Sequence, residues 1–187
     1  MEFSSAKDAV SASLTANKGA AERVGAGGVF TVTCVGPDGV EKWSDTFHNL
    51  VVNQGLQDMN DKYFKASGYT AVWYLGLVTG PGSGTTYAAS DTLSSHAGWT
   101  ENTDYTGSRK TVTFGTATTA DPSVISNSAS PSAFSITGTA TIAGAFLAST
   151  TDNSGVLFSA GDFTGGDKSV ASGDTLNVTY QFSLDAA

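Results

Sequence analysis

Strict alternation of apolar and polar residues marks the two clearest strands of the chain. Between Thr175 and Leu184 every second residue is apolar, and residues 29–35 repeat the pattern. A period of two puts successive side chains on opposite faces of a sheet, so one face of each strand should be buried. The turn sequence GPDG at residues 36–39 predicts a hairpin whose second strand covers residues 40–46.

One segment instead has the period of an amphipathic helix. Between Asn53 and Ala66, four apolar residues follow the spacing i, i+3, i+7 and i+8. They are Leu56, Met59, Tyr63 and Phe64. We expect this helix to pack that face against a sheet. The run AVWYLGLVT at residues 71–79 is apolar on both faces, which predicts a central strand with the helix as one of its two covers.

The second half of the chain is β-like almost throughout. Strands are expected at residues 110–117, 133–141, 144–149, 156–160 and 175–184. Turn signals such as Asp121-Pro122 and Gly165-Gly166 separate them, and a single helical turn is expected over residues 91–96. The pattern predicts a mainly β fold, jelly-roll-like or another antiparallel β-sandwich, with one packed α-helix between Asn53 and Ala66. We expect residues 29–187 to form a single β-rich domain.

Residues 1–28 differ from the rest because they are rich in Ala, Ser and Gly and poor in large apolar groups. Two interpretations stay open for this extended N-terminal arm. It is a flexible leader, or it orders on a neighbouring subunit. The glycine-rich residues 25–28 would then be a hinge into the folded domain.

Charge narrows the classes of partner. The formal net charge is −8, and residues 67–187 carry nine acidic and three basic residues. Phosphate neutralisation needs clustered Lys and Arg, so we expect no direct nucleic acid binding. The apolar runs are too short to span a membrane, and residues 1–28 lack the apolar core of a secretory signal. These observations predict a protein made in the cytoplasm without membrane association.

The chain offers little catalytic or metal-binding chemistry. Cys34 is the single cysteine and shares the buried face of its strand, so a small core residue is expected rather than a reactive thiol. The histidines are His48 and His96, outside any nucleophile elbow or HExxH pattern. We expect His48 to make an orienting hydrogen bond at a strand-to-helix corner. The turn at residues 152–155 lacks the glutamate that closes a calcium loop. We therefore expect no enzyme activity, no cofactor and no metal.

Trp99 and Tyr105 lie in an irregular aromatic stretch. Exposed rings here would suit a sugar platform or a protein interface, while packing in the core is equally natural. Both alternatives stay open.

Several ordered blocks of sequence, which cover most of the chain from about residue 29, carry a resemblance to a known family. The chain resembles a family of small structural proteins of tailed bacteriophages and prophages. The matching blocks are FHNLVV (47–52), NQGL (53–56), WYLGL (73–77), ASDTLSSHAGWTE (89–101), NSASPSAFSI (127–136), TIAGAFL (141–147) and SGDTLNVTY (172–180).

The resemblance implies a non-enzymatic virion protein, and we favour a capsid decoration (cement) protein on the capsid surface. Its partners would be the major capsid protein and copies of itself, as a dimer or trimer. The alternatives are a tail-associated protein (tail tube, adaptor or fibre base) and a carbohydrate-binding module. Residues 1–28 and the stretch at 99–105 are the expected contact surfaces. The expected contact residues are Phe3, Val10, Leu14, Val24, Trp99 and Tyr105.

Overall fold

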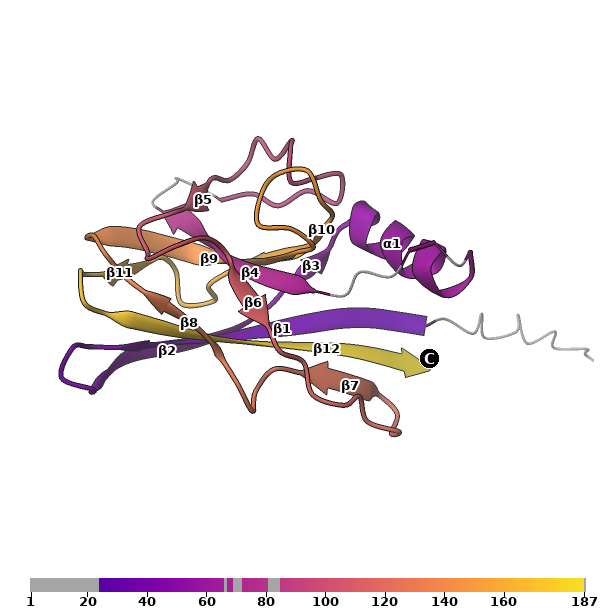
Figure 1. Cartoon of the computed structure of the whole chain (residues 1–187), viewed down its shortest axis with the longest axis horizontal. Helices are drawn as coiled ribbons and strands as arrows, with labels where there is room; N and C mark the ends of the chain where they lie inside the picture. The colour runs from indigo at the N-terminus through magenta and orange to yellow at the C-terminus, as the bar shows by residue number, and fades with distance from the viewer. Residues whose placement is uncertain (1–23, 66, 69–71, 81–84, 187) are drawn as a thin grey trace, which may run out of the picture.

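The computed structural model describes residues 24–65, 67–68, 72–80 and 85–186, and within them the strands form two antiparallel sheets packed as a sandwich (Figure 1). The first sheet has the order β2 (Glu41–His48), β1 (Val24–Val35), β12 (Thr175–Ala186), β7 (Ser123–Ser126), with β8 (Ser132–Ser135) also paired to β12. The second has the order β3 (Leu50–Val51), β10 (Leu157–Asp162), β9 (Ala140–Ala148), β4 (Trp73–Gly80), β5 (Glu101–Asn102), with β11 (Lys168–Val170) on β9 and β6 (Lys110–Val112) on β4. The mainly β sandwich expected from the sequence is confirmed.

The two alternating stretches pair with each other at the centre of the first sheet. β1 and β12 run antiparallel over their whole length, from Val24 opposite Ala186 to Val35 opposite Thr175. The shared apolar face is fully buried from Phe30 to Cys34 on β1 and from Leu176 to Tyr180 on β12, and the rings of Phe30 and Tyr180 lie 4.7 Å apart there. The β1–β2 hairpin has the expected GPDG turn, with Gly39 at a φ of +79°. Only a residue that tolerates positive φ fits this place, which explains the glycine.

The boundary expected at residue 28, between the N-terminal arm and the β-rich domain, falls inside β1. Gly25–Gly28 were expected to form a hinge, yet they pair with residues 182–185 of β12. Glycine has a low strand propensity, but its backbone N–H and C=O groups still complete the ladder that the long partner strand offers. The rest of the expected arm, residues 1–23, lies outside the described residues.

The central strand β4 is covered on both faces, as expected, but the second cover is not the helix. Leu75 and Leu77 face the core between the sheets. On the other face, Val78 and Phe146 pack against Leu93 and Trp99 from the loop at residues 85–100. Within this loop residues 91–96 form a tight turn closed by a Thr92–Ser95 bridge instead of the expected helical turn.

The helix α1 (Asn53–Tyr63) is shorter than expected and turned about its axis. Gly55 is its buried residue, and a Cβ there would lie 2.4 Å from the backbone oxygen of Phe158 on β10. The expected inner face is instead largely exposed: Leu56 at 42%, Tyr63 at 84% and Phe64 at 80%. At 100° per residue, the buried direction lies about a quarter turn from the expected one. A close glycine contact has replaced the expected apolar contact.

A single residue moves the chain from one sheet to the other and places the helix. β2 ends at His48 in the first sheet, and β3 begins at Leu50 in the second. Asn49 between them donates its backbone N–H to Gly28 and its side-chain amide to the Tyr180 hydroxyl at 2.9 Å. The hydrogen bonds at this corner thus come from Asn49, not from His48 as expected, and the His48 side chain is exposed.

No helix in the described part of the chain is long and apolar enough to cross a membrane.

Candidate functional site: an apolar cleft beside the helix

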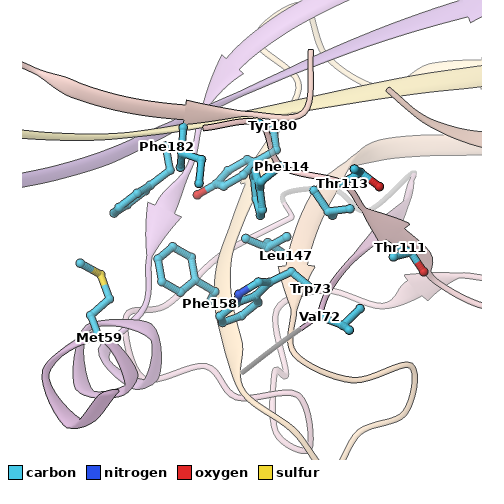
Figure 2. Close-up of a pocket in the computed structure, with 13 residues that line it drawn as sticks. Met59, Val72, Trp73, Thr111, Thr113, Phe114, Leu147, Phe158, Tyr180 and Phe182 are labelled. Carbon is cyan, nitrogen blue, oxygen red and sulfur yellow. The ribbon is translucent and has the colours of Figure 1, made fainter. Parts of the chain in front are cut away.

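An apolar cleft opens at the end of the sandwich nearest α1. Its volume is about 610 Å³, within the range of ligand and peptide sites. Figure 2 shows Met59 of α1 on one side, with Phe158 of β10 and Phe182 of β12 directed toward the space between them. The cleft is therefore built from both sheets and the helix.

Interlocked aromatic rings form its walls. Trp73 and Phe158 pack edge to face with ring centroids 5.3 Å apart, and Phe158 and Phe182 repeat the arrangement at 5.3 Å. Phe114, from the segment after β6, lies 6.3 Å from the Tyr180 ring. Edge-to-face packing holds rings in fixed orientations. The walls are therefore preformed.

Few polar groups line the cleft, and they are the Trp73 indole N–H in the wall, the Tyr180 hydroxyl on the floor and threonines at the rim. None of the described residues that line the cleft is an acid or a base of the Asp, Glu, Lys, Arg or His type, and Thr111 and Thr113 lie at its edge. The Tyr180 hydroxyl on the floor accepts hydrogen bonds from Asn49 and from Ser159 at 3.3 Å. Burial raises the pKa of Tyr180 far above its usual value, so the hydroxyl stays neutral. This arrangement is suited to binding apolar side chains.

Beside the cleft lies a second apolar feature, which we call the outer helix face: Leu56, Tyr63 and Phe64. The rings of Tyr63 and Phe64 pack edge to face at 4.9 Å while both remain in solvent. Large apolar side chains rarely gather in solvent unless they meet a partner. The outer helix face is thus the described surface best suited to a protein contact.

The expected contact residues Trp99 and Tyr105 lie in the interior. They are 6% and 5% exposed. Trp99 donates its indole N–H to Asp91 at 3.0 Å, and Tyr105 packs edge to face on Phe134 at 4.8 Å. Core packing, one of the two open alternatives, is what the structure shows. Neither ring is exposed enough to stack on a sugar.

The remaining expected contacts cannot be placed in the same way. Val24 is the first residue of β1. Phe3, Val10 and Leu14 lie outside the described residues, and their contact role stays a prediction.

His96 has a structural position in the loop over the second sheet. Its ring stacks on Trp99 with centroids 3.8 Å apart, and its Nδ1 lies 3.0 Å from the Trp99 carbonyl oxygen. These contacts fix the loop that covers β4.

Cys34 occupies the interior as expected. Its thiol donates to the Asp174 carboxylate at 3.7 Å. Burial, together with that negative charge, raises the pKa of Cys34 to about 11. Thiolate is the reactive form, so this cysteine is held in its unreactive state.

Metal coordination finds no support among the residues that the structure describes, where no group of three or more His, Cys, Asp or Glu could hold an ion. Asp152, in the turn considered for calcium, bonds within its own turn. Its Oδ1 accepts from the Ser154 backbone N–H at 2.9 Å and from the Ser154 hydroxyl at 2.6 Å. That pattern is an Asx turn.

Sequence reasoning missed both the cleft and the outer helix face. One usable signal was Gly55, since a glycine inside a helix often marks a close backbone contact.

Comparison with known proteins adds no assignment: no family model, no curated protein and no solved structure matches the chain.

Proposed function

We propose that this chain is a non-enzymatic structural protein of a tailed-phage virion, most directly a capsid decoration (cement) protein that binds and stabilises the major capsid lattice. The observation that carries the proposal is the outer helix face, an aromatic surface in solvent on a preformed β-sandwich. Aromatic side chains are enriched at protein interfaces. The resemblance to virion proteins indicates which class of partner such a surface would meet.

The blocks that carry the resemblance form the scaffold of the molecule. FHNLVV contains the crossing between sheets, WYLGL lies in β4, and TIAGAFL lies in β9. Their resemblance to blocks of a virion family supports a virion role for a protein with this scaffold. The contacts with a capsid partner would be made by surface residues outside these blocks. Each contact is small, and its repetition over a capsid lattice makes the total binding strong.

The architecture suits such a role because the sandwich is fixed internally across its two layers. Asp45 of β2 accepts hydrogen bonds from the backbone N–H groups of Thr164 and Gly165, at 3.1 and 3.0 Å, in the turn after β10. It also pairs with Lys168 at 3.5 Å. A rigid body loses little conformational freedom on docking.

The test is to add gold-labelled purified chain to particles of the encoding phage that lack it, and to locate the label by electron microscopy. The expected result is label over the faces of the head. A Tyr63→Ser/Phe64→Ser variant should lose most of that label, because two exposed aromatic anchors are removed.

Val40→Ser is the matched control. Val40 is 60% exposed in the β1–β2 turn, at the opposite end of the molecule from α1 (Figure 1), and its loss should leave labelling unchanged. Label confined to the tail would favour the tail-associated alternative, and label independent of Tyr63 and Phe64 would exclude the outer helix face as the contact.

A further inference from the structure

The floor of the cleft is formed by β12 and its neighbour β7, which contribute Tyr180, Phe182 and Ile125. On the neighbouring strand β1, the inward positions that precede Phe30 are Gly28 and Ala26. They pair with Phe182 and Leu184 of β12. Ala26 is exposed although it points inward. The Asn49 amide and the Tyr180 hydroxyl fill the space inside Gly28, and at Ala26 the inner face of β1 carries no large apolar side chain.

On the side of the cleft formed by α1 and the start of β4, apolar side chains are likewise left partly uncovered. Val72, just before β4, is 39% exposed, and Met59 of α1 is partly buried at the cleft edge. The cleft thus has apolar side chains above and below and nothing of the described chain between them (Figure 2). An apolar segment of polypeptide would complete the core.

The chain outside the described structure leaves from this place. Residues 1–23 precede Val24, which pairs with Ala186, and four residues along the strand Gly28 pairs with Phe182 of the cleft. Four strand residues span about 13 Å. The ten residues from Leu14 to Val24 span up to about 33–36 Å, so they are long enough to bring Leu14 back to the cleft.

The pattern of residues 1–23 matches the cleft. Phe3, Val10 and Leu14 are separated by seven and four residues, the spacing of one helix face, and Asp8 falls on the opposite side. So short and Ala/Ser-rich a helix is marginal in water and needs an apolar surface to form. The short tether gives such a segment an effective concentration in the millimolar range at its own cleft.

We propose that the N-terminal segment docks in the cleft of its own chain, with Val10 and Leu14 against Phe158 and Phe182. The segment then completes the core at the open end of the sandwich. This inference does not rest on the virion role, because it concerns contacts within one chain, and it gives Val10 and Leu14 a place in their own chain instead of the expected contact with a neighbouring subunit.

The experiment uses the full chain labelled with 5-fluorotryptophan and ¹⁹F NMR. Trp73 lines the cleft and Trp99 does not, so a Trp73→Phe variant assigns the reporter signal. In Val10→Ser/Leu14→Ser, the Trp73 resonance should shift and become sensitive to exchange of H₂O for D₂O. The Trp99 resonance should stay in place, which shows that the sandwich remains folded.

The matched control is Ser5→Ala/Thr15→Ala, which changes the side of the segment away from Val10 and Leu14 and should leave the Trp73 resonance unchanged. A Trp73 resonance that does not respond to Val10→Ser/Leu14→Ser overturns the proposal. A response that appears only as protein concentration rises, with dimers seen by light scattering, assigns the cleft to a second copy and also overturns docking within one chain.

Discussion

At the scale of single residues, Arg109 shows how a buried charge is satisfied. Its side chain is 3% exposed and forms a fork with Glu101, Nε to Oε1 at 2.9 Å and Nη2 to Oε2 at 2.7 Å. The other donors reach Asn153 and the backbone oxygens of Thr150 and Asp152. All five N–H groups are used, and the guanidinium lies 4.9 Å from the Phe146 ring centre. Arg109 thus fixes the turn after β9 to β5.

Arg109→Met should lower the free energy of unfolding by about 3–5 kcal/mol, because Glu101 and the two carbonyl groups lose a buried partner. Arg109→Lys should also destabilise, since an ammonium group cannot reproduce the planar fork. Urea denaturation measures both changes.

Lys65→Met is the control for this experiment. Lys65 pairs with Asp61 at 3.8 Å and is 75% exposed. Its loss should change the free energy of unfolding by less than about 0.5 kcal/mol. Equal effects at Arg109 and Lys65 would contradict a structural role for the buried fork.

At the scale of elements, α1 is positioned by hydrogen bonds and a glycine contact. Its first backbone N–H, at Asn53, donates to the Ala89 carbonyl oxygen at 2.8 Å, so the loop over the second sheet satisfies the helix start. The side-chain oxygen of Gln54 accepts from the Leu157 N–H at 2.9 Å. These bonds to distant segments hold the helix in the orientation that exposes Tyr63.

Gly55→Ala should destabilise the chain by about 1–3 kcal/mol, since the added methyl group meets the backbone of Phe158. In an isolated helix the same change would stabilise by about 1 kcal/mol. Thermal and urea unfolding distinguish the two signs.

Gly68→Ala is the control, because a Cβ there has no neighbour within 4 Å. The free energy of unfolding of this variant should lie within about 0.5 kcal/mol of that of the original chain. A stabilising Gly55→Ala would show that the helix does not approach β10 so closely.

At the scale of the whole molecule, stability depends on pH through buried carboxylates such as Asp174. Burial alone would raise the pKa of Asp174, but hydrogen bonds from Lys42 at 2.7 Å and the Ala171 N–H at 2.9 Å outweigh it and lower that pKa. A carboxyl whose folded-state pKa is depressed binds protons more readily in the unfolded chain. Its stabilisation is therefore present above the unfolded pKa of about 3.9 and is lost as pH falls through the lower folded pKa.

Asp174→Asn should accordingly lower the free energy of unfolding most at neutral pH. The difference in this free energy from the original chain should shrink as pH falls below about 4. Urea denaturation across that range gives the difference directly, which removes the contribution of the other carboxylates. Lys42→Met should weaken the same pH dependence. A difference that does not change with pH would mean that Asp174 is not held in its ionised form by the fold.

The sequence alone was enough to predict the β-sandwich, the β1–β2 hairpin and the buried positions of β1, β4 and β12. Those features follow from local periodicity and turn residues, which act on neighbours along the chain. It also left Trp99 and Tyr105 open between core and surface, because burial of an aromatic ring depends on segments distant in sequence.

The three-dimensional structure was needed to show how α1 is turned, which segment covers β4 and where the cleft opens. Periodicity says that a helix has an apolar face, but Phe158, a hundred residues away, decides by its close contact with Gly55 which face is buried. The pairing of residues 25–28 depends in the same way on β12. The surfaces proposed for function arise where such long-range contacts override local pattern.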